Sequence, residues 1–181
     1  VKKVLLIILV VICASNYSFG QPKDVEGWNK ARWGMTENEV LKVFEGKATA
    51  IEKPRKYQGL SKQWDAYSSI ILDEIEIGKD KYTVDFIFDD KDKKLIMIIV
   101  SIKNKSPLEL QFSSLEQMLT EKYGSPSFKI DSEGSHLLER ERAWNFPSTI
   151  IELKYFDMRV INSKSLKVVY NKNLKETHEN L

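Results

Sequence analysis

The chain has two histidines, and they are the first residues to consider for acid–base chemistry. His136 follows Gly134 and Ser135 at the expected start of a strand, and His178 lies in the polar C-terminal tail. A catalytic histidine needs a nucleophile within hydrogen-bonding reach and a partner that orients its ring. No serine of the chain stands in a G-x-S-x-G motif. The sequence therefore predicts no catalytic residue, and we expect the protein not to be an enzyme.

Acidic residues gather at Asp89, Asp90 and Asp92, a composition typical of calcium-binding loops. The pattern D-x-D-x-D-G is not met, because Lys94 stands where the third carboxylate is needed and no glycine follows it. We interpret the run as a solvated hairpin turn. The sequence predicts no metal site and no cofactor.

Charges alternate in the run Glu139-Arg140-Glu141-Arg142, which lies on an expected strand. We interpret the run as cross-strand ion pairing on a solvent-exposed face, where each pair contributes a fraction of a kcal/mol. The alternative interpretation is the polar rim of an interface.

The single cysteine, Cys13, lies within an apolar run of residues 4–14 that follows two lysines. A charged start, a short apolar run and small residues after it are typical of a signal peptide. The run is about half the ~20 residues that a membrane-spanning helix needs. We expect residues 1–20 to be a signal peptide, cleaved before Gln21 or, as second choice, after Ser15, and the protein to be periplasmic or secreted. The alternative is a lipid anchor on Cys13, although Ile12 stands where a small residue normally precedes the lipidated cysteine.

The charges of the chain nearly cancel, with 28 basic and 26 acidic side chains. Removal of residues 1–20 takes away Lys2 and Lys3 and no acid, which leaves 26 of each sign. A neutral domain lacks the basic surface that binds a phosphate backbone, so we expect no nucleic-acid partner. We expect no transmembrane helix after residue 20.

Start and stop signals in the sequence predict two helices. Thr36 and Glu39 form a capping box, Met35 and Val40 form a hydrophobic staple, and Gly46 is a suitable end. A second helix stops at the sequence Tyr123-Gly124-Ser125-Pro126. Its start has two candidate capping boxes, at residues 106–109 and 113–116, and we favour the later one.

The rest of the chain reads as antiparallel strands, expected at residues 70–77, 82–88, 95–102, 128–131, 137–144, 149–155 and 166–170. We predict an α+β fold, an antiparallel sheet with two helices packed on one face, as a single domain of residues 21–175 with a frayed tail at 176–181. Each half opens with a capped helix and continues in strands, which favours a tandem helix-plus-sheet repeat; simple α+β layering gives the same pattern.

Four tryptophans, Trp28, Trp33, Trp64 and Trp144, are candidates for core filling. Trp64 lies in residues 53–65, the least regular segment, together with Arg55 and Tyr57. Because Trp, Tyr and Arg dominate binding hot spots, we predict a partner contact at Arg55, Tyr57 and Trp64. The alternative is a loop that its aromatic residues pack over the sheet.

The segment Trp33-Gly34-Met35-Thr36, followed by Glu39 and Val40, and the later run L-x-x-K-Y-G-x-P at residues 119–126 resemble a group of uncharacterised bacterial exported proteins. That resemblance spans most of the chain after residue 20 and implies no known activity. More remotely, G-M-T-x-x-x-V at residues 34–40 is similar to the opening of the small lipoprotein of the outer-membrane β-barrel assembly machine, a module that recurs in tandem in β-lactamase-inhibitory proteins. The chain departs from that pattern, with Gly46-Lys47-Ala48 in place of Gly-x-Pro and no cysteine pairs, so this similarity informs the fold more than the function.

These observations predict a non-enzymatic protein-interaction domain of the cell envelope, which contacts another protein through its sheet face or residues 53–65. One alternative is a module that holds a small apolar ligand between the helices and the sheet. A second alternative is a carboxylate-dependent hydrolase, which requires two acidic side chains that converge in one cleft. The sequence leaves the partner and the oligomeric state open.

Overall fold

The computed structural model describes residues 24–57, 65–103 and 107–174. The first half of the chain contains the short strands β1 (Gly27–Trp28) and β2 (Ala31–Arg32), the helix α2 (Glu37–Val43), and the strands β3 (Ala48–Tyr57), β4 (Ala66–Ile77), β5 (Asp80–Asp89) and β6 (Leu95–Ile102). The second half contains the helix α3 (Leu108–Tyr123), the strands β7 (Phe128–Glu133), β8 (Leu137–Asn145) and β9 (Thr149–Met158), the 3-10 turn η1 (Arg159–Ile161), and β10 (Ser163–Lys172).

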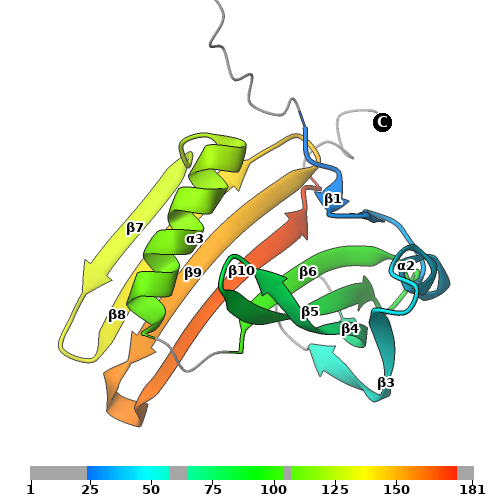
Figure 1. The fold of residues 1–181 in the computed structure, drawn as a ribbon, viewed down its shortest axis with the longest axis horizontal. Coiled ribbons are helices and arrows are strands. Elements are labelled where there is room, and N and C mark those ends of the chain that lie inside the picture. Colours follow the sequence, from blue (N-terminus) through cyan, green and yellow to red (C-terminus); the bar gives the residue numbers. More distant parts are fainter. Residues whose placement is uncertain (1–23, 58–64, 104–106, 175–181) are drawn as a thin grey trace, which may run out of the picture.

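Eight strands form one antiparallel sheet in the order β3-β4-β5-β6-β10-β9-β8-β7 (Figure 1). The last strands of the two halves meet at the centre, where Val100 of β6 lies opposite Val168 of β10. The run at residues 95–102 is apolar on both faces, and its place in the middle of the sheet is the place where such a strand is expected. The α+β class is confirmed, with a mostly antiparallel sheet and two helices in the described parts of the chain.

The first helix forms where its capping signals predict it. The Thr36 backbone N–H donates to the Glu39 carboxylate at 2.7 Å, and the Glu39 N–H donates to the Thr36 hydroxyl at 3.4 Å, which confirms the capping box. The helix is shorter than predicted, because it ends at Val43 and the chain turns through Gly46 at φ +74°. Glycine adopts that left-handed conformation without steric cost.

The second helix begins earlier than the favoured capping box. It starts at Leu108, after Pro107, and the predicted start at Ser113 is wrong. The Ser113 hydroxyl donates to the Glu109 carbonyl at 3.2 Å, a bond that a serine makes inside a helix. The earlier turn is held because Phe112 is buried against the sheet, at 1% exposure. The predicted stop is confirmed at Gly124, whose φ is +82°.

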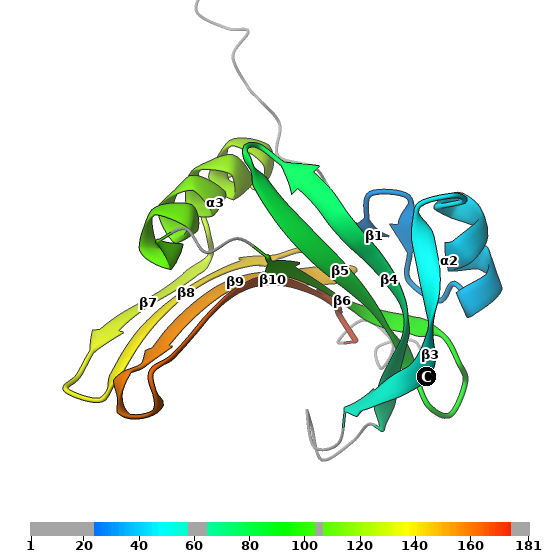
Figure 2. The same ribbon diagram turned by 60° about the horizontal axis from the view of Figure 1, so that its bottom comes forward.

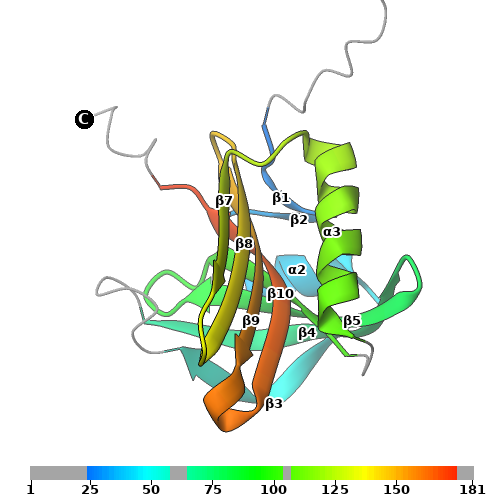
Figure 3. The same ribbon diagram turned by 90° about the vertical axis from the view of Figure 1, so that its left-hand side faces the viewer.

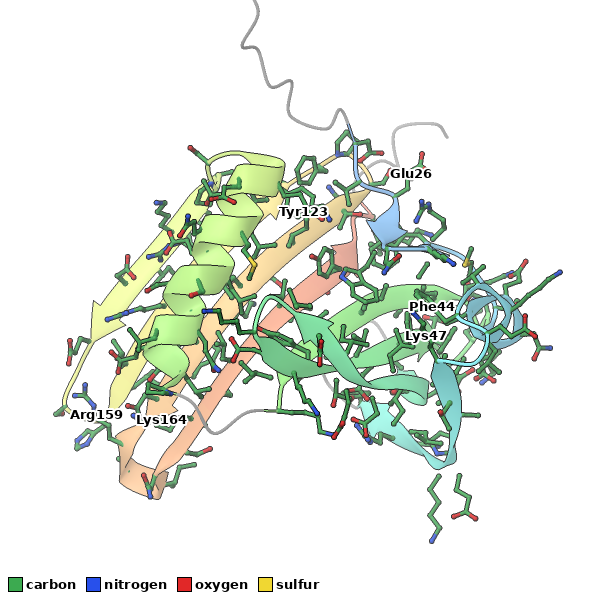
Figure 4. The ribbon with its side chains drawn as sticks, viewed as in Figure 1. Glu26, Phe44, Lys47, Tyr123, Arg159 and Lys164 are labelled. Carbon is green, nitrogen blue, oxygen red and sulfur yellow. The ribbon has the colours of Figure 1, made fainter. Side chains whose placement is uncertain are left out.

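The hydrophobic core combines buried side chains of the sheet with side chains of both helices. On β5, Tyr82, Val84, Phe86 and Phe88 alternate with more polar residues and are all buried. Phe86 meets Phe44, at the end of α2, with ring centroids 5.3 Å apart (Figure 4 labels Phe44). Side chains of α2 and α3 belong to the same hydrophobic core. In Figure 3, β7 to β10 run alongside α3, while β3 to β5 cross them behind.

The predicted strands were found, and several are longer than expected. The turn at residues 89–94 and the hairpin at residues 145–148 are confirmed. One strand was not predicted: β3 includes residues 53–57 of the segment 53–65, which was expected to be irregular. Its pairing with β4 shifts register between Ala50 and Arg55, so it lacks a regular two-residue alternation. The residues predicted as a signal peptide and as a frayed tail lie outside the described residues.

Residues 24–33 form hydrogen bonds with the second half of the sheet. Asp24 accepts hydrogen bonds from the Ser148 hydroxyl at 2.6 Å and from the Ser148 backbone N–H at 2.9 Å. The Trp33 indole N–H donates to the Thr149 hydroxyl at 2.7 Å, and that hydroxyl donates to the Val25 carbonyl. Residues distant in sequence are therefore joined at the turn between β8 and β9.

We expect this attachment to weaken in acid. Burial acts to raise the pKa of Asp24, but the hydrogen bonds from Ser148 and Val25 hold it below its ordinary value. A lowered native pKa stabilises the attachment above the unfolded value of about 3.9, and this stabilisation is lost as the pH falls through the native pKa. Hydrogen exchange at Ser148 should therefore accelerate below about pH 4 relative to the sheet centre. Asp24→Asn should remove the pH dependence; an unchanged profile would assign it to another group.

Candidate functional site

The face of the sheet opposite the core is the candidate site, and we call it the open face. On β5 it carries Thr83, Asp85 and Ile87, which alternate with the core residues. Figure 2 shows β9 and β10 bent into an arch, with α3 above it and no helix beneath. No described helix or strand covers the open face.

A charged cluster occupies the open face of the first half. Arg55 Nη1 lies 2.8 Å from Asp85 Oδ1, and the Ser68 hydroxyl donates to the same oxygen at 3.2 Å. Asp85 is 7% exposed, whereas the Arg55 side chain is 53% exposed. Burial raises the pKa of the neighbouring Tyr57, the negative charge of Asp85 raises it further, and Arg55 opposes the change. The carboxylate therefore holds an exposed arginine in a fixed position.

An apolar cluster adjoins these charges. Ala66, Ile87 and Ile96 are buried on the open face, although no described element covers it. Their cover comes from partly buried side chains of neighbouring strands: Tyr57, Met97 and Ile99. The exposed parts of those three side chains make an apolar surface next to Arg55.

A second charged cluster lies on the open face of the second half. Lys154 Nζ lies 2.7 Å from Glu152 Oε1 and 3.3 Å from Glu141 Oε1. The Asn171 amide donates to Glu152 at 2.7 Å. Burial acts to lower the pKa of Lys154, but the two carboxylates raise it overall. Two acidic side chains thus converge on one ammonium group, and Lys154 forms ion pairs with both.

Two of the three predicted contact residues meet in space. Arg55 and Tyr57 lie together on the open face, as the last regular part of β3, and not in a loop as predicted. Trp64 lies outside the described residues. Asp85 and Lys154 were not among the predicted site residues; the alternation of apolar and polar residues along β5 was the signal that could have placed Asp85 on this face.

The charge-alternating run on β8 is divided between the two faces. Glu141 is on the open face with Lys154, as expected for an exposed ion pair. Arg142 is on the opposite face, 7% exposed, and its Nε lies 2.6 Å from Glu116 Oε1 of α3. The prediction of a wholly solvent-exposed run is therefore wrong, because successive residues of a strand point to opposite faces.

Among the residues that the structure places, no cluster of three or more His, Cys, Asp or Glu side chains is arranged to hold a metal ion. His136 is exposed in the turn before β8. His178 and Cys13 belong to the parts of the chain that are not described. The open face offers hydrogen-bonding groups, fixed charges and apolar contact.

Two cavities lie away from the open face. One of about 530 Å³ lies between residues 24–32 and the end of α3, and its lining includes Asp24, Arg32 and Lys122. Another of about 380 Å³ lies at the start of α2, and its lining includes Glu37 and Lys93. Charged side chains line both, so neither supports the alternative of a small apolar ligand.

Comparison of the chain with protein-family models, with curated proteins and with solved structures finds no match. Among the described helices, none combines the length and the apolar character that crossing a membrane requires. The fold and the open face define the class: an α+β domain in which no described helix or strand covers one face of the sheet.

Proposed function

We propose that the protein is a non-enzymatic interaction domain of the cell envelope, and that its open face binds a partner protein. The observation that supports this proposal is the apolar surface of Tyr57, Met97 and Ile99, which lies beside an exposed, fixed arginine on a face that no described element covers. Tyr, Met and Arg are enriched at protein interfaces.

The open face is suited to a protein partner because its groups are rigidly placed. They project from paired strands and not from loops, so little side-chain freedom is lost on binding. The Arg55–Asp85 and Lys154–Glu152 ion pairs fix charges of both signs at separate positions. A fixed pattern of both signs selects partners of matching pattern and disfavours a uniformly charged polymer.

A single substitution on the open face tests this proposal. Met97→Glu places a charge at the centre of the apolar surface, and Ser114→Glu places the same charge on the exposed side of α3. We expect Met97→Glu to weaken binding of the partner about tenfold or more, and Ser114→Glu to leave it unchanged. Proteins captured from envelope extracts by wild-type protein would be identified and their affinities measured with both variants.

Circular dichroism of each variant is the control for folding. If the captured proteins bind wild-type protein and Met97→Glu equally, the open face is not the binding surface, and the proposal fails.

We infer the location from residues 1–20, whose charged start and short apolar run favour export. Mass spectrometry of the native N-terminus would test this inference. A mature chain that begins at Gln21 would support a freely diffusing protein, and a lipid on Cys13 would support an anchored one. An N-terminus that retains the whole apolar run would contradict both.

We further infer that the two halves are copies of one unit, a helix followed by four antiparallel strands. The element order supports this: α2 precedes β3 to β6, and α3 precedes β7 to β10. The antiparallel pairing of β6 with β10 relates the halves by an approximate two-fold axis at the sheet centre. The two outer strands, β3 and β7, are then equivalent positions.

A further inference from the structure

The outer strands of the sheet differ in how their free edges are protected. An edge strand presents unpaired backbone groups that can pair with another chain. The edge of β3 is broken by the register shift after Ala50 and by Pro54, which has no N–H, and it carries Lys53 and Lys56. In contrast, β7 pairs with β8 in continuous register over all six residues and contains no proline (Figure 1).

The contacts of Arg142 show which backbone groups of β7 point outward. Its Nη1 donates to the carbonyls of Ile130 and Glu141, each at 2.9 Å. Ile130 lies opposite Glu141 in the ladder, so one nitrogen reaches both carbonyls only if both point into the space between β7 and β8. Ile130 therefore forms a hydrogen-bonded pair with Glu141. The N–H and C=O groups of Lys129 and Asp131, the residues on either side, point to the free edge.

The sequence of β7 is complementary to itself about Ile130. In an antiparallel pairing of two copies centred on this residue, Ile130 lies opposite Ile130 of the second copy on the open face. On the α3 face, Lys129 lies opposite Asp131 of the second copy, and Asp131 lies opposite Lys129 of the second copy. Phe128, 49% exposed, comes next to the second copy's Ile130 along the diagonal.

We propose that a second copy of this chain binds the edge of β7, with the two β7 strands paired antiparallel about Ile130. In this register the backbone N–H and C=O groups of Lys129 pair with those of Asp131 in the second copy, because the backbone groups of both residues point to the free edge. The two opposite-charge contacts fix the register, and the paired isoleucines bury apolar surface between them. A two-fold axis makes this interface isologous and closed.

The edge is held in position for this pairing. Arg159 donates to Glu133 at 2.6 Å and to the Gly134 carbonyl at 2.9 Å, which ties the end of β7 to the turn between β9 and β10 (Figure 4 labels Arg159). A two-fold axis perpendicular to the sheet keeps the same face outward in both copies. The dimer therefore places two open faces side by side in one continuous sheet, and the inference does not depend on what the open face binds.

Complementary charge reversals test the register. Lys129→Asp leaves acidic side chains at both residues 129 and 131, and Asp131→Lys leaves basic side chains at both. The two side chains are 55% and 56% exposed, but each also has a partner within the chain, since Lys129 Nζ lies 3.6 Å from Glu116 and Asp131 lies 3.0 Å from Arg142. Circular dichroism of each variant therefore accompanies the measurement, to show that the variant is folded. We expect wild-type protein, purified from cells that express the full chain, to be a dimer by sedimentation velocity. Each variant alone should dimerise about tenfold or more weakly, and an equimolar mixture should recover the dimer, because every contact is then between opposite charges.

Two further variants complete the experiment. Lys53→Asp, on the opposite edge, should leave the dimer intact. Ile130→Arg places two like charges at the two-fold axis and should yield monomers, and mixing it with either charge-reversed variant should not restore the dimer. This variant tests the interface if one of the charge-reversed variants fails to fold. A monomeric wild-type protein, or a mixture that stays monomeric while both variants fold, would overturn the proposal. Dimers that persist in both single variants would also overturn it.

Discussion

Replacing Trp144 with alanine is expected to lower the free energy of unfolding by about 3–5 kcal/mol. Trp144 is 2% exposed, so truncation leaves a large cavity in the core between the sheet and α3. Its indole N–H also donates to the Gly124 carbonyl at 2.7 Å, which ties β8 to the end of the helix. Urea denaturation followed by far-ultraviolet circular dichroism measures the loss.

A matched variant separates the ring from its hydrogen bond. Trp144→Phe keeps one aromatic ring in the core and removes the donor together with part of the indole, so it should cost less than Trp144→Ala, about 1–3 kcal/mol. Leu110→Ala is the exposed control, since Leu110 is 69% exposed, and it should change stability by less than about 0.5 kcal/mol. If Trp144→Phe is as costly as Trp144→Ala, packing of the ring is not the main contribution.

The parts of the fold that the sequence predicted are those fixed by neighbouring residues. The capping box at Thr36 and Glu39 lies within one helical turn, and its geometry follows from the two residue types alone. The alternation along residues 82–88 needs only the two-residue period of a strand. The stop at Gly124 needs only a residue that tolerates positive φ.

The parts that the sequence did not predict depend on distant residues. Two equally good capping boxes precede the second helix, and burial of Phe112 against the sheet selects the earlier start. The strand β3 is held by β4 on both sides of a shifted register, which no local pattern in residues 48–57 reveals. Asp85 pairs with Arg55, which lies thirty positions away in the sequence, so the charged cluster of the open face becomes evident only in the folded chain.

Arg142 gives the second large prediction. Its side chain is 9% exposed, and its guanidinium contacts Glu116 at 2.6 Å and Asp131 at 3.0 Å and lies 5.2 Å from the centre of the Phe112 ring. Removing Arg142 takes away the close partner of Glu116 and leaves it only the exposed Lys129, whose Nζ lies 3.6 Å from Glu116 Oε1. Because Glu116 remains 24% exposed, we expect Arg142→Met to cost about 3 kcal/mol, at the lower end of the range for buried pairs.

The double variant Arg142→Met with Glu116→Leu is expected to recover most of that loss. It replaces the pair by apolar side chains of similar volume, and such exchanges are often neutral or stabilising, so its stability should lie within about 1 kcal/mol of wild type. Hydrogen exchange adds a local test, because Arg142 also bonds the Ile130 carbonyl and supports β7. In both variants the amides of β7 should exchange faster than in wild type while those of β6 do not. A double variant no more stable than Arg142→Met would show that the weakened pairing of Glu116 is not the source of the lost stability.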